Sequence, residues 1–293
     1  MAFLQLIRAP NVLTSASNIL AAYLLAATVF SPSLNQTTSQ LTDLILLVIA
    51  SALLYSGGMI MNDCFDYDED LRERPHRPLP SGAITLSRAW QLCCAALILG
   101  LLTAAWVGIT QFIIASTLAV LIILYNGIAK QTVWAPWIMG SCRYSNWLLG
   151  LSLLGLQTSS FIIALPVLLY VSGLTMLSRV ETTAHNTQPL LHAVLLISAS
   201  AALITLLIIS EVLTGTWALV VLLAAELLIL YLSYMTWHNF TPPRIQLMVK
   251  TLVIGIIPLD AILVWAGGNM WGGLLVLSLL APVQLAAKRL YIT

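Results

Sequence analysis

Long apolar runs separated by short polar segments dominate this chain. A helix needs about 20 mostly apolar residues to cross the hydrocarbon core of a bilayer. Ten stretches meet or approach this length, and the last two are separated only by a short glycine-rich connection. The pattern therefore predicts nine to ten transmembrane helices, over residues 11–30, 41–61, 86–108, 111–129, 138–156, 161–178, 190–210, 216–236, 247–266 and 271–287.

Composition supports an all-α polytopic membrane protein. Of 293 residues, 60% are hydrophobic and 8% are charged, whereas a soluble domain averages roughly 45–50% apolar and about 25% charged residues. The net charge of +1 provides no basic patch for a nucleic acid partner. No composition shift divides the chain, so we expect residues 1–293 to form a single transmembrane domain.

The basic residues predict the orientation of the helices, because cytoplasmic loops are enriched in Lys and Arg. Arg8 precedes the first predicted span, Arg179 ends the sixth, and Lys288 and Arg289 lie close to the end of the chain. With ten crossings, all twelve basic residues fall on one side. We therefore expect both termini and the polar loops after the second and sixth spans to face the cytoplasm.

The loop after the second predicted span, residues 62–82, holds six of the eleven acidic residues. Asp63, Asp66 and Asp70 share one face if the helix continues, and Asn62 joins that face four residues before Asp66. Three neighbouring carboxylates repel one another unless a cation or protons intervene, and Mg²⁺ prefers such oxygen ligands. The spacing favours a magnesium site, and the alternative is a solvated acidic cap on the helix.

Three arginines, Arg72, Arg74 and Arg77, follow the acidic residues directly. The guanidinium group suits bidentate contacts with phosphate oxygens. Carboxylates for a metal beside guanidinium groups for an oxygen anion indicate a diphosphate site. The alternative is that these arginines only follow the cytoplasmic enrichment of basic residues.

The composite pattern resembles the first signature of the UbiA superfamily of intramembrane prenyltransferases. Asn62, Asp63, Asp66 and Asp70 match its NDxxDxxxD part, and residues 77–82 read RPLPSG. In addition, Tyr125 and Lys130 at the end of the fourth predicted span resemble a Tyr/Lys pair of that family. The likeness in span number and loop position extends over nearly the whole chain.

This resemblance implies a helical bundle around a central cavity that opens sideways to lipid. Mg²⁺ would bridge Asp63, Asp66 and Asp70 to an isoprenyl diphosphate, and a lipophilic, often aromatic, acceptor would receive the isoprenyl group. The metal and the arginines would stabilise negative charge on the departing diphosphate. Apolar walls would exclude water.

The second UbiA signature is altered in this chain. The family carries a second DxxxD after the sixth span, where this sequence has Glu181 and His185 four residues apart. A neutral imidazole is a poor Mg²⁺ ligand, so either one metal site is weakened, with Glu181 as its remaining ligand, or His185 acts as a base. This loop, together with RYSNWLLG at residues 143–150, resembles the UbiA-like EboC proteins.

Four further residues are candidates for the cavity. Arg143 and Asn146 begin the fifth predicted span and are expected to line the cavity, with a topology anchor as the alternative for Arg143. Glu226 and Asp260 fall near mid-span, where a charged side chain is costly and normally faces the interior. They are either acceptor contacts or proton sites, or internally hydrogen-bonded structural residues.

The leading hypothesis is a Mg²⁺-dependent enzyme that transfers an isoprenyl group to a lipophilic acceptor within the membrane. The alternative is a non-catalytic protein that binds or transports isoprenoid diphosphates, and turnover separates the two. The predicted metal ligands are Asp63, Asp66, Asp70 and Glu181. The predicted catalytic residues are Asn62, Asp63, Asp66, Asp70, Glu181 and His185, and the predicted substrate-binding residues are Arg72, Arg74, Arg77, Tyr125, Lys130, Arg143, Asn146 and Arg179.

Overall fold

The computed structural model describes residues 2–30, 38–182, 184 and 186–290, and every regular element in these ranges is a helix. The prediction of an all-α protein is therefore confirmed. The elements are α1 (Ala2–Leu6), α2 (Ala9–Val29), α3 (Thr38–Phe65), α4 (Tyr67–Glu73), α5 (Leu86–Val107), α6 (Ile109–Leu124), the π-helix η1 (Tyr125–Ala129), α7 (Ala135–Leu151), the 3₁₀ turn η2 (Ser152–Leu154), α8 (Thr158–Ile163), α9 (Leu165–Ser178), α10 (Gln188–Ile209), α11 (Ala218–His238), α12 (Pro242–Ile254), α13 (Ile256–Ala266), α14 (Met270–Ser278) and α15 (Leu280–Leu290).

Eight helical stretches of the described residues are long and apolar enough to cross a bilayer. Two predicted spans correspond to shorter helices: residues 138–156 fall on the 17-residue α7, and residues 271–287 fall on α14 and α15. The protein is thus an integral multi-pass membrane protein, and nine to ten crossings remain a prediction. The eight stretches are Ala9–Val29, Thr38–Phe65, Leu86–Val107, Ile109–Ala129, Thr158–Ser178, Gln188–Ile209, Ala218–His238 and Pro242–Ala266.

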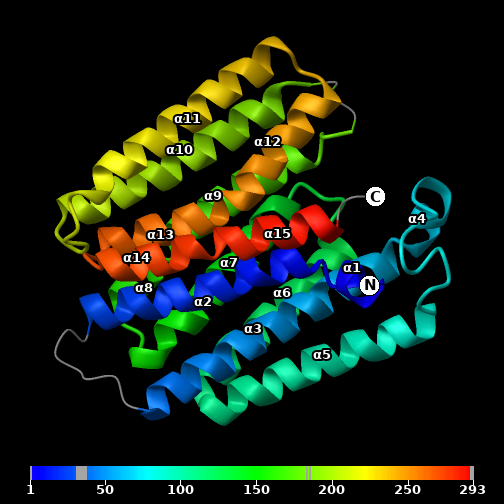
Figure 1. Ribbon diagram of the computed structural model, residues 1–293, viewed down its shortest axis with the longest axis horizontal. Helices are drawn as coiled ribbons and strands as arrows, with labels where there is room; N and C mark the ends of the chain where they lie inside the picture. The colour runs from blue at the N-terminus through cyan, green and yellow to red at the C-terminus, as the bar shows by residue number, and fades with distance from the viewer. Residues whose placement is uncertain (1, 31–37, 183, 185, 291–293) are drawn as a thin grey trace.

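Helices α2 and α7 occupy the middle of the bundle (Figure 1). Helix α2 packs against α3, α7 and α13, while α7 also packs against α6 and α9. The hairpin of α10 and α11 runs along one edge, and α5 runs along the opposite edge (Figure 1). Residues on α2 and α7 can therefore contact helices on both sides of the bundle, α3 and α6 on one side and α9 and α13 on the other.

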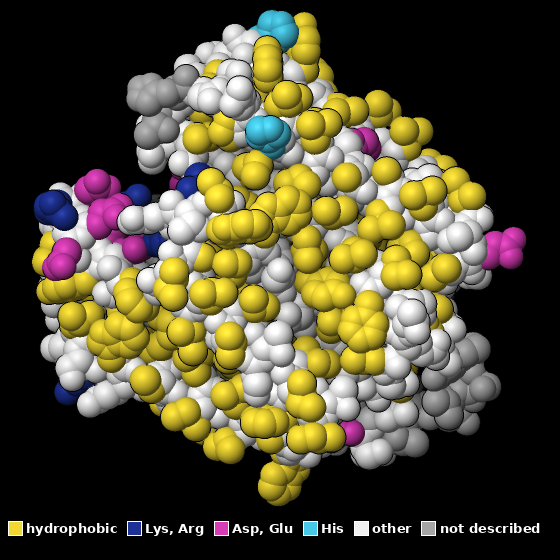
Figure 2. Space-filling view, turned by 180° about the vertical axis from the view of Figure 1, so that it is seen from behind, with side chains coloured by type: hydrophobic (Ala, Val, Ile, Leu, Met, Phe, Trp, Pro, Cys, Tyr) yellow, Lys and Arg dark blue, Asp and Glu magenta, His cyan; other side chains and the backbone are white. Residues whose placement is uncertain are grey.

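The outer helices carry apolar side chains on their exposed faces. Leu223 and Leu227 on α11, for example, are 61% and 57% exposed. Hydrophobic side chains cover much of the surface in Figure 2, whereas acidic and basic side chains gather mainly at one end. This distribution is typical of a protein whose sides face lipid, because water would oppose such exposure.

The two polar connections predicted to form the site lie at the same end of the bundle. Helix α4, within the connection from α3 to α5, is at the end where α9 stops and α12 begins (Figure 1). The connection after α9 carries Glu181, whose carboxyl is close enough to Arg74, just beyond α4, to interact electrostatically. Side chains from the two connections therefore lie in the same region, around α4.

Gly140 lets α7 and α9 approach closely, and we expect Gly140→Ala to destabilise the protein. A methyl group at this position would lie 2.6 Å from the backbone carbonyl oxygen of Leu168, so one helix must move. Such overpacking costs about 1–3 kcal/mol. The loss is measurable as a lower midpoint of thermal unfolding in detergent.

Gly127→Ala is the matched control, because the nearest atom to its added methyl group is 3.8 Å away, on Phe65. An equal loss of stability in both variants would show that the close approach of α7 and α9 does not limit the fold.

Candidate active site

Three carboxylates, those of Asp63, Asp66 and Asp70, lie where α3 gives way to α4, and we call them the acidic face. Helix α3 ends at Phe65 and α4 begins at Tyr67. The backbone hydrogen bonds nevertheless continue, because Asp66 N donates to Asn62 O at 3.0 Å and Asp70 N donates to Asp66 O at 2.8 Å. The helical i+4 spacing is therefore kept across the junction between α3 and α4.

Arg77 joins two members of the acidic face. Its Nη1 lies 2.7 Å and 3.0 Å from the two carboxylate oxygens of Asp70 and 3.9 Å from Oδ1 of Asp63. Arg74 contributes a second contact with Asp70 at 3.4 Å. Because Asp70 is 1% exposed, its charge depends on these partners.

Arg8 completes the pairing of Asp63, with Nη2 donating to Oδ1 at 3.2 Å. Arg8 connects α1 to α2 and has a left-handed backbone with φ of 50°. That conformation is uncommon for a residue with a side chain and is found where the surrounding structure requires it. Here it places the guanidinium group beside the acidic face, a role that sequence reasoning missed.

The π-helical turn η1 positions Lys130, whose ammonium group pairs with Asp66. The turn η1 has an i to i+5 hydrogen bond from Lys130 N to Tyr125 O at 2.9 Å, and π-helical turns are frequent at functional sites. Lys130 Nζ bonds to Oδ2 of Asp66, which also accepts a 3.0 Å hydrogen bond from Asn62. The turn thereby brings Tyr125 and Lys130 to the same end of α6, while their role in substrate binding stays a prediction.

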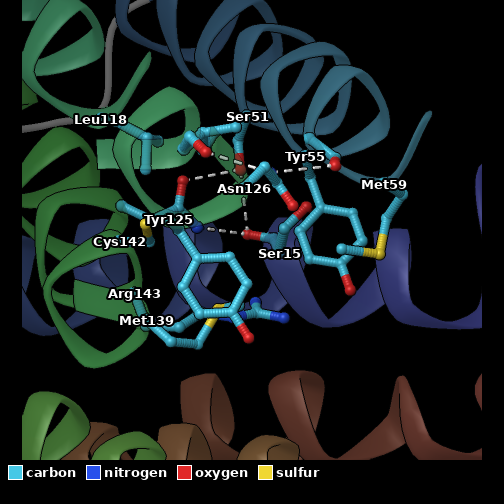
Figure 3. Close-up of a pocket in the computed structure, with 13 residues that line it drawn as sticks. Ser15, Ser51, Tyr55, Met59, Leu118, Tyr125, Asn126, Met139, Cys142 and Arg143 are labelled. Atoms are coloured by element: carbon cyan, nitrogen blue, oxygen red, sulfur yellow. Dashed lines mark hydrogen bonds between the residues drawn. The ribbon is translucent and has the colours of Figure 1, made fainter. Parts of the chain in front are cut away.

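A cavity of about 60 Å³ lies between α2, α3, α6, η1 and α7. Figure 3 shows Tyr55, Tyr125 and Arg143 around it. The guanidinium of Arg143 lies 5.0 Å from the centre of the Tyr55 ring, within range of a cation–π contact. Arg143 and Asn146 therefore line a cavity, and their role in substrate binding stays a prediction. The remaining lining residues are Ser15, Ser51, Gly58, Met59, Leu118, Ile122, Asn126, Met139 and Cys142.

Arg143 is buried and belongs to a polar network that reaches α13. Its Nη1 and Nη2 each donate a 2.9 Å hydrogen bond, to Asn18 and Thr14 respectively. Asn18 in turn donates to both carboxylate oxygens of Asp260, at 2.9 and 2.8 Å. Asp260 is thus internally hydrogen-bonded and does not line this cavity.

The other mid-span acid, Glu226, lies elsewhere in the bundle. Its Oε1 accepts a hydrogen bond from Ser198, and it lines a second cavity of about 230 Å³ between α9, α10, α11, α12 and α13. Glu226 is therefore both internally hydrogen-bonded and adjacent to open space.

The second polar connection brings one of its predicted site residues to the acidic region. Glu181 is half-buried, and burial raises the pKa of its carboxyl while Arg74 and Arg8 oppose that rise. His185 lies outside the described residues. Arg179 is exposed and donates to the Gln131 carbonyl at 3.5 Å.

Arg72 lies on the exposed side of α4, where its Nε donates to the Asp68 carbonyl at 3.1 Å. It is not paired with the acidic face, unlike Arg74 and Arg77. Asp68 is itself exposed, so the exposed side of α4 is separate from the side that carries Asp70.

The carboxylates of the acidic face are held in ion pairs. Among the described residues, no three His, Cys, Asp or Glu side chains form a ready metal site. Carboxylate and amide oxygens still fit Mg²⁺ chemically, and the two contacts of Asp66 both use Oδ2. The donor set therefore fits Mg²⁺, while Asp70 as a ligand stays a prediction because Arg77 contacts both of its oxygens.

Sequence reasoning also missed two cavity residues. Tyr55 lies on α3 two turns before Asn62, and Asn126 follows Tyr125 directly in η1. Tyr55 is on an apolar span with no motif around it, so no sequence signal identified it. For Asn126, the sequence signal that could have identified it is its position directly after Tyr125, a predicted site residue.

The model of the UbiA prenyltransferase family matches residues 15–247. This chain belongs to that family. Digeranylgeranylglyceryl phosphate synthase of Sulfurisphaera tokodaii is 35% identical over 124 residues, which cover 42% of this chain and 41% of the relative. The same enzyme of Metallosphaera sedula is 37% identical over 91 residues, covering 31% of this chain and 32% of the relative. The chain thus spans less than half the length of these relatives in the matched segments.

Solved structures show the same fold over almost the whole chain. A UbiA homologue from Archaeoglobus fulgidus, bound to GPP and Mg²⁺, superposes with a TM-score of 0.70 at 16% identity, covering 95% of this chain and 100% of the other. A digeranylgeranylglyceryl phosphate synthase structure gives a TM-score of 0.69 at 24% identity, covering 92% and 98%. The predicted UbiA fold is therefore confirmed.

We expect Glu181→Gln to stabilise the Mg²⁺-free protein at neutral pH. Because the pKa of Glu181 is raised, the folded protein retains this proton at pH values where the unfolded chain has lost it. The stability contributed by this proton is lost as pH rises through the folded pKa. The gain over wild type should appear in thermal unfolding near pH 7.5 and vanish below the ordinary pKa of glutamate.

Glu73→Gln, at an exposed residue of α4, serves as the control and should give little change. A gain for Glu181→Gln that grows toward acid would contradict the assigned direction of the pKa shift.

Proposed function

We propose that this protein is a Mg²⁺-dependent prenyltransferase that moves an isoprenyl group from its diphosphate to a lipophilic acceptor within the membrane. One observation carries the proposal. The acidic face, with its basic partners, adjoins a cavity lined by Tyr55, Tyr125 and Arg143, and η1 connects the two regions. A polar anion site beside an aromatic cavity suits a substrate with a diphosphate head and an apolar chain.

The diphosphate would bind to the basic groups that now pair with the acidic face. Arg74, Arg77 and Lys130 have long, flexible, positively charged side chains that suit oxygen anions, and the planar guanidinium group of Arg favours phosphate. Asp63 and Asp66, with Asp70 and Glu181, would hold Mg²⁺ through carboxylate oxygens. When bound, the metal supplies positive charge that stabilises the departing diphosphate.

The reaction is a substitution at the allylic carbon. The carbon–oxygen bond to the diphosphate breaks, and both electrons leave with the diphosphate. A lone pair or ring π pair of the acceptor forms the new bond, and the acceptor proton passes to the diphosphate or to water. The Tyr55 and Tyr125 rings can stabilise positive charge on the allylic carbon, and the apolar lining of the cavity excludes competing water.

The relatives support the class of donor. Two are named digeranylgeranylglyceryl phosphate synthase, and structural neighbours from Archaeoglobus fulgidus were solved with GPP or DMAPP and with Mg²⁺. The altered pair Glu181 and His185 favours, as a second candidate, a protein that retains donor binding without turnover. Release of diphosphate by the purified protein separates these functions.

Binding of an isoprenyl diphosphate should depend on Asp66 far more than on Asp68. Asp66→Asn removes the charge that is paired with Lys130, whereas Asp68 is exposed on α4. We expect Asp66→Asn to lower Mg²⁺-dependent affinity by about 10–100-fold, the scale seen when a metal site loses a supporting group. Equilibrium binding of labelled geranylgeranyl diphosphate in nanodiscs measures both variants.

Asp68→Asn is the matched control because it makes the same chemical change two residues away. Equal losses in the two variants would show that the acidic loop acts only through diffuse charge. Diphosphate release should accompany donor binding in the wild-type protein when an extract of membrane lipids supplies the acceptor. Donor binding without any release would instead support the non-catalytic alternative.

We also propose that the acidic region faces the cytoplasm. The region holds Arg74 and Arg77, and cytoplasmic loops are enriched in Lys and Arg. Cysteines introduced one at a time at exposed Ser81 and exposed Asn186 should react with a membrane-impermeant maleimide only from the cytoplasmic side. The background carries Cys94→Ser, which removes the exposed native cysteine and leaves the three buried ones. Labelling in right-side-out and inverted vesicles measures this. Reaction of the two positions from opposite sides would exclude a shared site.

A further inference from the structure

The second cavity, of about 230 Å³, lies away from the acidic face, between α9, α10, α11, α12 and α13. The hairpin of α10 and α11 and the neighbouring helix α12 lie toward one edge of the bundle (Figure 1). The cavity shares no lining residue with the one that holds Tyr55 and Arg143. Most of its lining is aliphatic, as at Leu222, Ile229 and Leu259. Its contents must therefore be largely apolar.

One carboxyl group, that of Glu226, lines this apolar space. Its Oε1 accepts a hydrogen bond from Ser198 on α10, whereas its Oε2 has no partner among the described residues. Glu226 is half-buried, and Oε2 keeps accessible surface, unlike the enclosed side-chain oxygen of Asn126. A polar group at mid-span is costly and normally finds a partner. A ligand in the cavity would provide one.

The other polar side chains of the lining are already engaged. The hydroxyl groups of Tyr170, Ser200 and Thr251 each donate to a backbone carbonyl at 2.8 Å, so none has a proton left for a ligand. No Lys, Arg or His lines the cavity in the part of the chain that the structure describes. An anionic head would therefore be buried without a counter-charge, which is costly, and the cavity does not suit a second diphosphate.

A break in a membrane-spanning helix forms part of the wall. Helix α12 ends at Ile254 and α13 begins at Ile256, and residues on both sides of Gly255 line the cavity. Pro258 has no N–H, so the carbonyl of Ile254 lacks the donor that a continuous helix would supply. Freed backbone groups at membrane depth are found where neighbouring groups or a cavity accommodate them. The break therefore supplies a further hydrogen-bond acceptor beside this cavity.

We propose that this cavity binds a single-chain lipophilic alcohol, whose chain fills the apolar space and whose hydroxyl bonds to Oε2 of Glu226. A hydroxyl both donates and accepts, so it matches Glu226 whether the carboxyl is ionised or protonated. The volume lies below the roughly 300–1,000 Å³ of pockets for drug-sized ligands, which favours one chain over a two-chain lipid. This site is separate from the acidic face, and its ligand binds independently of prenyl transfer.

The test compares three diazirine-bearing probes, dodecanol, its methyl ether and dodecylamine, on the full chain in nanodiscs without donor or Mg²⁺. After photolysis, mass spectrometry of the peptides locates the label. We expect saturable labelling of α11 and α12 that is about three- to tenfold stronger with the alcohol than with the ether, the scale of one hydrogen bond. Equal labelling by alcohol and ether, stronger labelling by the amine, or no labelling of α11 and α12 would overturn the proposal.

Glu226→Leu should abolish the preference for the alcohol over the ether, because no side-chain oxygen is left to bond the hydroxyl. Glu226→Gln should keep the preference, since an amide also donates and accepts. An unchanged preference in Glu226→Leu would overturn the assignment of Glu226. Loss of the preference in Glu226→Gln would show that charge holds the ligand, which would contradict a hydroxyl head.

Ala225→Trp tests the location, because Ala225 lines the cavity and the larger side chain would fill it. Ala224→Trp is the matched control, since Ala224 is exposed one position earlier on α11 and does not line the cavity. We expect Ala225→Trp to remove the saturable labelling by the alcohol and Ala224→Trp to retain it. Labelling at the wild-type level in a folded Ala225→Trp protein would overturn the proposed location, and the Glu226 variants decide the matter if that protein does not fold.

Discussion

Charge pairing at the end of a membrane bundle is the interaction on which the site depends. The acidic face brings carboxylates together beside an apolar bundle, where repulsion and desolvation both oppose their ionised forms. Arg8, Arg77 and Lys130 reach this face from three separate segments. Each pairing fixes the position of its own segment. The connection between α1 and α2, the loop after α4 and the turn η1 therefore all meet at the acidic face.

The ion pairs also define what ligand binding must change. Lys130 contacts Asp66, and Arg77 contacts Asp70 and Asp63. If a diphosphate takes over these cations, the released carboxylate oxygens become available to Mg²⁺. Donor and metal would then favour each other's binding, since coupling between two ligands is reciprocal. The altered second signature fits this scheme, because Glu181 adds one carboxylate near Arg74 and Arg8.

Hydropathy and spacing predicted the helical fold and the acidic face, because both depend on local sequence. The segments around Arg8 and Asn126 were not predictable in this way. Arg8 reaches Asp63 through a left-handed residue between two helices, and Asn126 faces the cavity on a π-helical turn. These positions depend on packing between segments far apart in the chain, which an apolar sequence pattern does not encode. Arg72, whose motif position suggested phosphate contact, lies on the exposed side of α4, and its contact with phosphate stays a prediction.

The most direct test of this account is a calorimetric titration of Mg²⁺ into the purified protein with and without a non-hydrolysable isoprenyl diphosphate analogue. Because the acidic face is ion-paired, we expect weak Mg²⁺ binding to the free protein and binding at least about tenfold tighter with the analogue present, within the usual range of coupling between sites. Tight Mg²⁺ binding that does not change when the analogue is added would contradict the account.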